Sequence, residues 1–589
     1  MSSPVSLLRH KLRELGVQAF FLPHNDPHNN EYLASHDMRM PFLSGFHGSS
    51  GHILVTDDMA FLWTDGRYWL AAEKQLYPEW TMMKLTEGVP KYFEWVEKNM
   101  AEGSIIAYDP MIITADGLRM RKEYFEKKGF VFKGLDCNPV NEIWEDRPPL
   151  CPDPIFRHED QYAGKTMKEK LDEVGSKLKE KYLLTNALDE IAWVLNLRGN
   201  DIDFNPVFFS YLVLEKTDSN IIPHFFISKN KTINVSEYLE SNGVIVHEYG
   251  EIFTYIQTLT DEVRVDGSKC SAALYEKISK PINKSSIISE LKAIKNPREI
   301  QGFRDSHVRD GLALCKYFAW LENELKIGNV WTEYTAADVL TNFRKQVTLN
   351  MGLSFGTISS VGANAAIIHY KPEKDTASNI TNKSVYLLDS GGHYLDGTID
   401  TTRTVHFGTP TDWEKECYTR VLLGNFDLER MIWPNSWSIS GAELDIMARR
   451  RLWEVGLEYN HGTGHGVGYY LNVHEGPQGI SRGRKAELVV GMNVTNEPGY
   501  YEAGNFGIRI ENVMFVQNHA EIKGSYCFEN VTMVPYEINL IKNDLLVDSD
   551  KAFINKYHEK IRNTFKPMLE EQGDALTLAW LERKTSLIE

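Results

Sequence analysis

The sequence predicts a mixed fold in which two successive α/β domains precede a third domain of strands and helices. Strand-like and helix-like segments alternate through the first half of the chain. A proline-rich segment interrupts them at residues 146–154, and a strong helix start follows residue 295. The 589 residues suffice for about three or four domains. We expect domains at residues 1–148, 149–295 and 296–589.

In the first domain, apolar runs indicate strands and charged runs with helical spacing indicate helices. We expect strands in VQAFFL, SGHILVTDDMAFLWT and SIIAYD, and helices in VPKYFEWVEKNM and LRMRKEYFEKKG, after a short amphipathic helix at the N-terminus. The segment DRPPLCPDP, from Asp146 to Pro154, holds four prolines. Because proline continues neither a helix nor a central strand, this segment predicts a linker.

The second domain repeats this alternation. A charged helix at residues 166–181 and the segment NALDEIAWVLNLRG precede two strands, FFSYLVLEK and IIPHFFISKN. The similarity between the first two domains is weak, so the sequence leaves open whether they are duplicates. In the third domain, Asn296 is expected to cap a long helix, with Pro297 in its first turn and Glu299 three residues after the cap. A helical C-terminal extension is expected from about residue 537.

Composition and charge restrict the class of partner. Hydrophobic residues make up 42% and charged residues 25%, as in soluble globular proteins. A net charge of −17 argues against nucleic acid or an anionic membrane surface as the main partner. The six cysteines form no CxxC pair, and we expect reduced thiols. No secretory signal, lipid anchor or bilayer-spanning run is recognisable, and we expect a cytoplasmic protein.

The stretch HGTGHGVGYYLNVHEGP, from His461 to Pro477, raises three interpretations: a phosphate loop, a metal-binding cluster or tight packing. Its first four glycines recur at every second position, which fits neither the dinucleotide fingerprint nor a Walker loop. The segment HEGPQ is no zinc-binding HExxH motif, because Gln478 replaces the second histidine. So many glycines disfavour a helix. What remains is a histidine, His465, on an extended segment.

A second stretch, SVYLLDSGGHYLDGTIDTTRTVHFG, reads as a strand that ends at Asp389, a Gly-Gly turn and one returning strand. Alternation places Asp400 on the same face as Thr402 and Thr404. Asp389 and Asp400 can therefore converge across a hairpin. The spacing of the two aspartates also evokes a calcium-binding EF-hand loop. That possibility is excluded, because glycine, histidine and tyrosine occupy its required acidic and glycine positions.

A third stretch, NVTNEPGYYEAGNFGIRIENV, places Glu497 at the end of an apolar strand and puts Arg509 and Glu511 on one face of another. Alone, each carboxylate is explained by a turn or an ion pair; Glu511, for instance, can pair with Arg509. Together, four carboxylates and one histidine at strand ends form a ligand set for two hard divalent cations. Bridging carboxylates hold such metals about 3.5–4 Å apart.

The order Asp389, Asp400, His465, Glu497, Glu511 resembles the two-metal pita-bread peptidases. The local motifs are most similar to Xaa-Pro aminopeptidase in its long, cytosolic, eukaryotic form. Further matching stretches are FLSGFHGSSGHILVT, LWTDGRYWLAA, LDEIAWVLNLRGNDI, SSVGANAAIIHYKP, VTMVPY and ALTLAWLERKT. The resemblance implies two creatinase-like α/β domains followed by a pita-bread catalytic domain.

The resemblance implies a role for each metal ligand. Asp389 would bind one metal, Asp400 and Glu511 would bridge both, and His465 and Glu497 would complete the shell of the other. The expected cofactors are two divalent ions, Mn²⁺ first, with Zn²⁺ or Co²⁺ as alternatives. One departure is Asn496, which stands where the family pattern leads us to expect an acid; we expect it to alter the ligands' surroundings and not the number of metals.

The resemblance also implies a reaction. A metal-bridging hydroxide would attack the carbonyl before proline, with Glu497 acting as base and then as acid. His369 and His474 would hold the substrate carbonyl and stabilise the tetrahedral intermediate. His461 would line the pocket for the proline ring. Further substrate contacts are expected from Arg67, Tyr501 and Arg509.

The expected substrates are peptides with proline at position 2, and a homodimer through the catalytic domain is implied. An X-Pro bond is a tertiary amide without an N–H, so it escapes peptidases that bind this group. Two alternatives stay open at this point: a prolidase that cleaves X-Pro dipeptides, and a non-catalytic relative that only binds peptides. Because all five ligand positions are filled, the second alternative is disfavoured.

Overall fold

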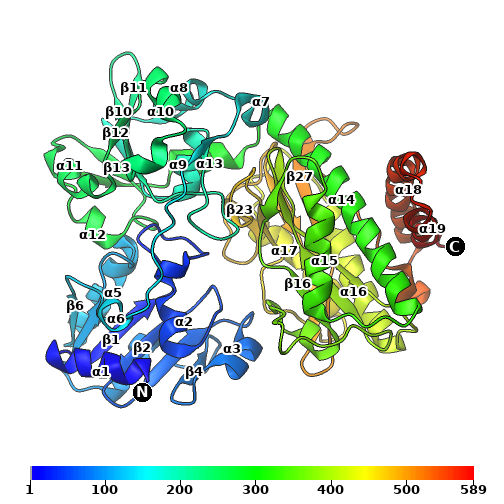
Figure 1. Cartoon of the computed structure of the whole chain (residues 1–589), viewed down its shortest axis with the longest axis horizontal. Helices are drawn as coiled ribbons and strands as arrows, with labels where there is room; N and C mark the ends of the chain where they lie inside the picture. The colour runs from blue at the N-terminus through cyan, green and yellow to red at the C-terminus, as the bar shows by residue number, and fades with distance from the viewer. Residues whose placement is uncertain (1–2) are drawn as a thin grey trace. The chain divides into compact units, whose positions relative to one another are not determined.

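A computed structural model describes residues 3–589, which form two compact units. The first unit ends at Lys292, and the second comprises Gln161–Gly164 and Ala293–Glu589. The first unit contains two six-stranded sheets, and the second contains several smaller sheets with long helices. Figure 1 labels the elements of both units.

The first sheet has the strand order β4-β3-β2-β1-β5-β6. Its strands are β1 (Ala19–Pro23), β2 (His52–Thr56), β3 (Ala60–Thr64), β4 (Thr81–Lys84), β5 (Ile105–Tyr108) and β6 (Val131–Gly134). Alternate residues of β1 face opposite sides, with Phe20 and Leu22 in one apolar core and Ala19 and Phe21 in the other. Both faces of the sheet are therefore covered, as the α/β prediction requires.

The second sheet has the order β12-β11-β10-β8-β13-β14. Its strands are β8 (Tyr182–Thr185), β10 (Tyr211–Lys216), β11 (Ile221–Phe226), β12 (Ile245–His247), β13 (Val263–Val265) and β14 (Pro281–Asn283). In each sheet the strand that comes first in the sequence is central. On one side of it, two strands follow in antiparallel pairing and an edge strand in parallel pairing. On the other side, two strands follow in parallel pairing. The two domains thus share one topology, which their weak sequence similarity left open.

The predicted elements of these domains are present. The linker Asp146–Pro154 carries neither helix nor strand, and β7 (Phe156–Arg157) pairs with β9 (Leu197–Arg198) beyond it. The helices are α1 (Pro4–Glu14), α2 (Arg39–Ser44), α3 (Trp69–Gln75), α4 (Tyr92–Asn99), α5 (Ala115–Lys127), α6 (Pro139–Ile143), α7 (Asp160–Ala163), α8 (Met167–Lys177), α9 (Leu188–Val194), α10 (Ser236–Ser241), α11 (Ile252–Thr258), α12 (Ala272–Tyr275) and α13 (Ile287–Ala293).

The second unit opens with α14 (Pro297–Lys326), and its predicted start is confirmed. The Asn296 side chain accepts hydrogen bonds from the backbone N–H groups of Arg298 and Glu299, and the Glu299 carboxylate accepts one from the backbone N–H of Asn296. This capping box satisfies donors that a helix start otherwise leaves unpaired. The further helices are α15 (Glu333–Lys345), α16 (Asp412–Glu429), α17 (Gly441–Trp453), α18 (Asp548–Gln572) and α19 (Ala575–Lys584).

The strands of this unit form two three-stranded sheets, one four-stranded sheet and two pairs. The orders are β15-β18-β19, β16-β17-β20, β21-β28-β27-β24, β22-β23 and β25-β26. The bounds are β15 (Asn350–Leu353), β16 (Ile358–Val361), β17 (Tyr386–Ser390), β18 (Gly392–Tyr394), β19 (Gly397–Thr398), β20 (Thr401–Val405), β21 (Ile432–Pro434), β22 (Gly464–Gly466), β23 (Glu475–Ile480), β24 (Asn493–Asn496), β25 (Gly499–Glu502), β26 (Phe506–Arg509), β27 (Asn512–Asn518) and β28 (Ser525–Asn530).

One strand prediction is wrong. The returning strand is expected to be continuous over residues 397–407, but the structure divides it into β19 and β20, with Asp400 in the gap before β20. A Cβ at Gly391 would lie 1.9 Å from the carbonyl oxygen of Ile399, so the backbones cross here at a distance that only glycine permits. The crossing frees Asp400 from the ladder and leaves its side chain available to the site.

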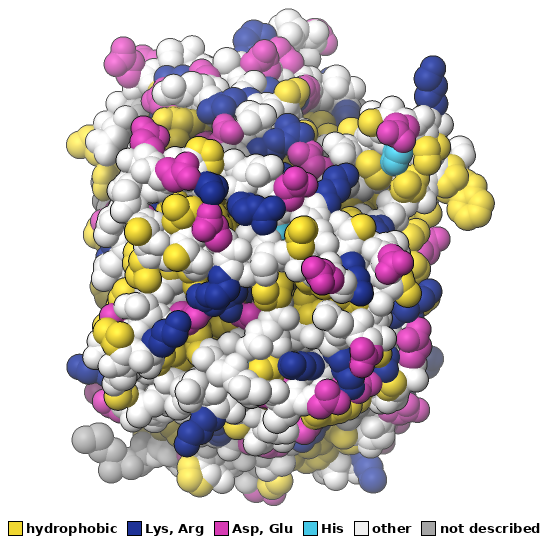
Figure 2. Space-filling view, turned by 90° about the vertical axis from the view of Figure 1, so that its right-hand side faces the viewer, with side chains coloured by type: hydrophobic (Ala, Val, Ile, Leu, Met, Phe, Trp, Pro, Cys, Tyr) yellow, Lys and Arg dark blue, Asp and Glu magenta, His cyan; other side chains and the backbone are white. Residues whose placement is uncertain are grey.

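The main core of the second unit joins its helices to the sheet of β16, β17 and β20. The C-terminal helices belong to this core, since Trp580 of α19 stacks on Phe318 of α14 with ring centroids 6.2 Å apart. Figure 2 shows one face of the molecule, with basic and acidic side chains interspersed among apolar ones. Among residues 3–589, no helix has the length and apolar content needed to cross a membrane.

Candidate metal centre and active site

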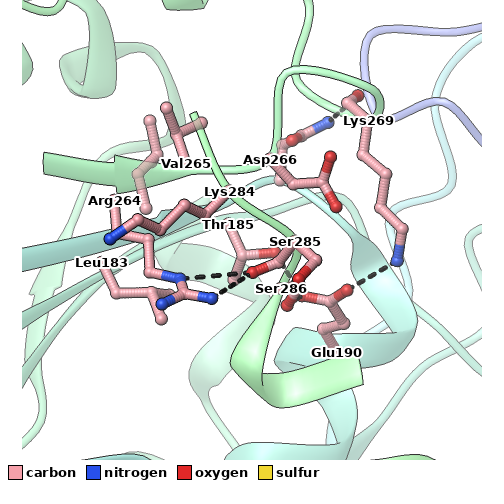
Figure 3. A pocket seen from close by; sticks show the side chains of 12 residues that line it. Leu183, Thr185, Glu190, Arg264, Val265, Asp266, Lys269, Lys284, Ser285 and Ser286 are labelled. Atoms are coloured by element: carbon pink, nitrogen blue, oxygen red, sulfur yellow. Dashed lines mark hydrogen bonds and ion pairs between the residues drawn. The ribbon is translucent and has the colours of Figure 1, made fainter. Parts of the chain in front are cut away.

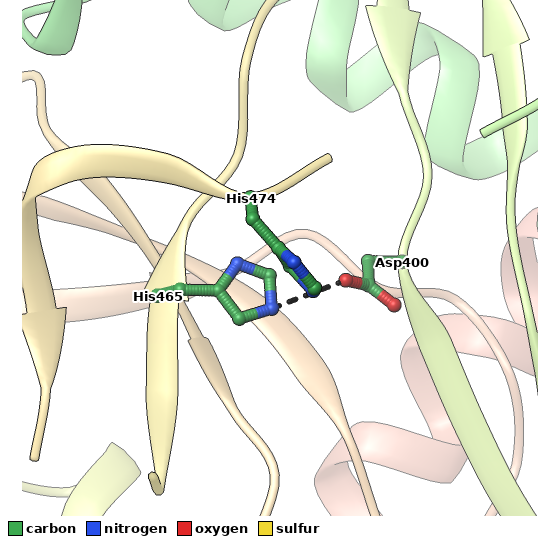
Figure 4. A group of neighbouring side chains, drawn as sticks. All are labelled: Asp400, His465 and His474. Atoms are coloured by element: carbon green, nitrogen blue, oxygen red, sulfur yellow. Dashed lines mark ion pairs between the residues drawn. The ribbon is translucent and has the colours of Figure 1, made fainter. Parts of the chain in front are cut away.

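The five predicted metal ligands come together in the second unit, at the ends of short strands. Asp389 lies in β17 opposite Thr402 of β20, and His465 lies in β22. Asp400, Glu497 and Glu511 stand just outside β20, β24 and β27. Their ligand atoms form three overlapping groups, each within 4.8 Å, and together these contain Asp389, Asp400, His465, His474, Glu497 and Glu511. Figure 4 shows Asp400, His465 and His474 facing one another.

Glycines let the His465 segment approach its neighbours. A Cβ at Gly464 would lie 1.9 Å from the carbonyl oxygen of Thr495 in β24. A Cβ at Gly466 would lie 2.2 Å from the side-chain nitrogen of Gln478 in β23. No side chain fits at such distances, so the glycines on either side of His465 serve close packing against two strands.

Two threonines hold the ligands in place. Thr402 Oγ1 donates to Glu511 Oε2 at 2.8 Å. Thr495 Oγ1 donates to Glu497 Oε1 at 3.2 Å and accepts from the backbone N–H of His465 at 3.0 Å. The His465 ring donates through Nδ1 to the carbonyl of the next residue at 2.8 Å, so Nε2 faces the carboxylates. Metal-bound histidines are commonly oriented in this way.

Arg509 is the cation at the edge of the cluster. Its Nη2 donates to Asp389 Oδ2 at 2.7 Å, and its Nη1 donates to the Tyr501 hydroxyl at 2.7 Å. The Tyr501 hydroxyl also bonds to His461 Nε2 at 2.9 Å. The ion pair of Arg509 is thus with Asp389, whereas Glu511 is held by Thr402, and the simple Arg509–Glu511 pair considered from the sequence is not what the structure contains.

The carboxylates of the cluster are close enough to shift one another's pKa values. Burial raises the pKa of Glu511 well above its usual value, and the neighbouring Asp400, Asp389 and Glu497 raise it further. Burial also raises the pKa of Glu497 and of Asp389. For His465, burial lowers the pKa, but the hydrogen bond to Asp400 and the charge of Glu497 outweigh it and raise the pKa to about 9. Bound cations would relieve this repulsion between buried carboxylates.

The residues present fit a metal centre. Asp389 Oδ1 is buried and has no hydrogen-bond partner within residues 3–589, although a buried carboxylate oxygen normally has one. The donors are mainly carboxylate oxygens with one or two imidazoles, the set that hard divalent cations prefer. Asp400 and Glu511 each belong to two of the three groups. Two adjacent metal positions can therefore share these two carboxylates.

The predicted substrate-binding residues lie in different places. The His474 ring is 4.3 Å from the His465 ring, within the ligand groups. The His461 ring packs between Tyr459 and Tyr501, with its Nδ1 3.9 Å from Glu497 Oε2. His369 is half-buried in the turn after the short helix η4 (Gly362–Ala366), outside the ligand groups.

Two predicted substrate residues differ in their surroundings. The η4 turn that precedes His369 packs closely against β26. A Cβ at Gly507 of β26 would lie only 1.8 Å from the carbonyl oxygen of Ala365 in η4. Arg67 belongs to the first unit, where its Nη2 pairs with Asp65 Oδ2 at 2.8 Å. The ligand groups are thus formed entirely by residues of the second unit.

Two residues that shape the centre, Thr495 and Asn425, are not among the residues predicted from the sequence. Thr495 lies in β24 two positions before Glu497, which directly follows that strand, so alternation is a signal that could have found it. Asn425 on α16 donates through Nδ2 to the backbone carbonyls of Asn496 at 2.8 Å and Ile510 at 3.3 Å. No sequence pattern marks this clamp, which joins the segments before Glu497 and Glu511.

The unexpected Asn496 faces α16 and not the carboxylates. Its side-chain nitrogen donates to the Asn425 carbonyl at 2.8 Å, and its side chain is fully buried. Since neighbouring residues of a strand point to opposite faces, Glu497 is directed the other way. The asparagine therefore belongs to the support of the centre.

A pocket in the first unit gives no competing site. Figure 3 shows the Lys269 side chain bonded to Glu190 and the Arg264 side chain bonded to Ser285. The Glu190 carboxylate accepts from Thr185 at 2.9 Å, Ser286 at 2.6 Å and Lys269 at 2.7 Å. These partners satisfy the buried carboxylate internally, so it does not call for a ligand.

Comparisons with known proteins agree with this architecture. Models of the creatinase/prolidase N-terminal domain match residues 5–136 and 146–299. The model of metallopeptidase family M24 matches residues 301–518, and that of its C-terminal region matches residues 524–588. The predicted order of two creatinase-type domains and a pita-bread catalytic domain is confirmed.

Relatives that align over nearly their whole length are named as Xaa-Pro aminopeptidases. A probable Xaa-Pro aminopeptidase P of Coprinopsis cinerea is 40% identical over all of this chain and 98% of its own length. Xaa-Pro aminopeptidase 1 of Dictyostelium discoideum is 40% identical over 99% of this chain and 96% of its own. The crystal structure of an X-prolyl aminopeptidase from Caenorhabditis elegans, described as a cytosolic enzyme with a di-nuclear active site, is 34% identical with a TM-score of 0.95 and 99% coverage of both chains. The chain belongs to the Xaa-Pro aminopeptidase family of M24 metallopeptidases.

Proposed function

We propose that this chain is an aminopeptidase that uses two divalent metal ions to hydrolyse the bond between an N-terminal residue and a penultimate proline. The observation that carries the proposal is the convergence of three buried carboxylates, the half-buried Glu497 and His465 in and beside short strands. Relatives of about 40% identity that bear the name Xaa-Pro aminopeptidase support the substrate class.

Asp389 would hold one metal, Asp400 and Glu511 would bridge both, and His465 and Glu497 would complete the other. Two bound cations would supply a hydroxide nucleophile at neutral pH and polarise the scissile carbonyl. We propose Mn²⁺ ahead of Zn²⁺ or Co²⁺, because carboxylates predominate in the ligand set. The di-nuclear site of the Caenorhabditis elegans enzyme supports two ions per chain.

Glu497 would move the proton between the nucleophile and the leaving proline nitrogen. Burial already favours its protonated form, and Thr495 fixes one of its oxygens at 3.2 Å. The leaving nitrogen of an X-Pro bond carries no hydrogen and must receive one when the bond breaks. A carboxyl group whose pKa is raised by burial can both take up a proton and return it.

The substrate would be held by side chains around this centre. His461 lies against the rings of Tyr459 and Tyr501 at 4.8 and 5.4 Å, and these apolar surfaces suit a pyrrolidine ring. His369 and His474 would hold the substrate carbonyl and stabilise the tetrahedral intermediate. Further substrate contacts are proposed for Arg67, Tyr501 and Arg509.

We also propose domain boundaries at residues 148/149 and 295/296, a cytoplasmic location and a homodimer formed through the catalytic domain. The C. elegans enzyme, described as cytosolic, supports the location. The dimer has support in α17, where Ile446 (53% exposed) and Trp453 (45%) lie seven residues apart on one helix face. Light scattering of the purified chain, with Trp453→Ser as the variant, measures the oligomeric state; a monomeric wild type refutes the dimer.

The deciding experiment compares peptides of different length. We expect Mn²⁺-dependent release of arginine from an Arg-Pro-Pro peptide, with much slower cleavage of an Arg-Pro dipeptide. Cleavage of the dipeptide alone identifies a prolidase and refutes the proposal. A chain that binds no divalent metal and stays inactive with added Mn²⁺ is a peptide-binding relative.

A further inference from the structure

Two histidines face each other at the edge of the second sheet of the first unit. His224 Nδ1 lies 3.2 Å from His247 Nε2. The opposite nitrogens of the two rings point to carboxylates: His224 Nε2 is 3.4 Å from Glu215 Oε2, and His247 Nδ1 is 3.9 Å from Glu251 Oε2. The four side chains thus form one line of carboxylate, imidazole, imidazole and carboxylate.

The strand register places this line on one face of the sheet. His224 of β11 pairs with Val213 of β10, so Glu215, two residues further along β10, points to the same side. On the other flank, Phe226 of β11 pairs with His247 of β12. Figure 1 shows β10, β11 and β12 together in the first unit. The strand order places β12 at the edge of the sheet.

The carboxylates determine where the ring protons sit. The Glu215 carboxylate, 3.4 Å from His224 Nε2, accepts a hydrogen bond and favours a proton there, whereas the negative charge of Glu251, 3.9 Å from His247 Nδ1, favours a proton on that nitrogen through electrostatic attraction. Both facing nitrogens are then left with a lone pair. Burial lowers the pKa of both imidazoles, which disfavours an extra proton between them. Two lone pairs 3.2 Å apart repel each other unless a cation lies beside both.

We propose that His224 and His247 bind one borderline divalent cation of the Zn²⁺ class, with water completing its coordination. Tetrahedral Zn²⁺ with Zn–N distances of about 2.0–2.1 Å places two ligand nitrogens roughly 3.3 Å apart. The observed separation of 3.2 Å matches this geometry. The carboxylate behind each ring is the usual outer partner of a metal-bound histidine.

The surroundings suit a bound ion. The side chains of His224 and His247 are 10% and 22% exposed, which leaves the pair accessible from solvent. The Tyr255 ring of α11 lies 5.0 Å from the His224 ring and 5.3 Å from the His247 ring, and Phe226 stacks on His247 at 4.6 Å. An ion here would join β11 to β12 and stabilise the edge of the sheet.

This site differs chemically from the catalytic centre. The catalytic ligands are mostly carboxylates, which suit hard cations such as Mn²⁺, whereas two imidazoles select Zn²⁺, Ni²⁺ or Cu²⁺. The two sites lie in different units of the chain, so each can be altered alone.

The test measures Zn²⁺ binding by the untagged full-length chain in equilibrium dialysis with Mn²⁺ in excess. We expect the wild type to bind one Zn²⁺ more than His247→Gln. His10→Gln is the matched control, because His10 is a 74% exposed histidine of the same unit that faces a single carboxylate. It should bind as the wild type does.

Two further readouts separate binding from folding. Zn²⁺ should raise the melting temperature of the wild type and of His10→Gln but not that of His247→Gln, whose metal-free melting temperature should equal that of the wild type. Glu215→Gln should keep the site and weaken Zn²⁺ by about 10-fold. If His247→Gln binds as much Zn²⁺ as the wild type, the two rings only hydrogen-bond to each other and the proposal is wrong.

Discussion

A buried arginine connects the C-terminal extension to the metal centre, and it yields a specific prediction. Arg403 Nη1 donates to the backbone carbonyls of Thr402 at 2.8 Å and Glu511 at 2.7 Å. Its Nη2 donates to the Val534 carbonyl at 2.8 Å and the Tyr557 hydroxyl at 3.0 Å. Because Tyr557 belongs to α18, this helix helps to fix the backbone that carries Glu511.

Replacement of Tyr557 by phenylalanine removes one hydroxyl and leaves the packing intact. That hydroxyl also contacts the carbonyls of Thr532 and Val534, each at 2.9 Å. Loss of a buried hydrogen bond with its partners left behind costs about 1–3 kcal/mol of unfolding free energy. Arg403 then has one anchor fewer while it holds Glu511. We expect Mn²⁺ to bind up to about 10-fold more weakly. This is the low end of the loss in metal affinity that follows when a residue behind the metal ligands is replaced.

The assay combines urea unfolding with Mn²⁺ titration of peptidase activity, and Tyr418→Phe is the matched control. Tyr418 is a fully buried tyrosine of α16 whose hydroxyl accepts from the backbone N–H of Glu537 at 2.9 Å. Its removal should lower stability by a similar amount and leave Mn²⁺ affinity unchanged. If Tyr557→Phe loses stability but binds Mn²⁺ as the wild type does, the extension does not act on the centre.

Four other substitutions test the centre and its surroundings. Glu497→Ala and His465→Ala should each abolish turnover while circular dichroism stays that of the folded chain; activity in either variant contradicts the assignment. Gly464→Ala should lower both activity and stability, the latter by about 1–3 kcal/mol in urea unfolding, since its Cβ would lie 1.9 Å from the Thr495 carbonyl oxygen. Burial raises the pKa of Glu429 to about 7, so its contribution to stability is full below about pH 4.5 and is lost as pH rises through 7. In urea, the free energy of unfolding of Glu429→Gln should therefore equal that of the wild type at pH 5 and exceed it by roughly 1–3 kcal/mol at pH 8.5. Equal stability of the two proteins at both pH values contradicts a raised pKa of Glu429.

The candidate ligands could be found from the sequence because the four carboxylates stand at or beside the end of a strand and His465 lies within a short one. At such a point a carboxylate is next to a turn signal, as Glu497 is next to Pro498-Gly499, and alternation then gives its face. The helix start at Asn296 was equally predictable, because a capping box is a local pattern. Local patterns of this kind are encoded in a few adjacent residues.

Contacts between distant segments could not be predicted in the same way. The Asn425 side chain, on a helix, donates to the backbone carbonyls of Asn496 and Ile510, which lie 71 and 85 positions further along the chain. Many other asparagines stand in helices without such a role. The break of the expected strand before Asp400 depends on the crossing of Gly391 and Ile399, which is a fact of tertiary packing. The facing of His224 and His247 likewise requires the register of two parallel strands.

The support of the centre also explains how repelling carboxylates stay together in one place. The threonines at 402 and 495 hold individual carboxylate oxygens, while Arg403 and Asn425 hold the backbone on the outer side of the same segments. Each of these four side chains is buried, so their hydrogen bonds compete little with water. A backbone fixed from the outside keeps the ligands in position before any cation arrives, and the affinity for metal then comes from relief of charge repulsion and not from ordering of the chain. This is why a change behind the ligands, such as Tyr557→Phe, should affect metal binding without touching a ligand.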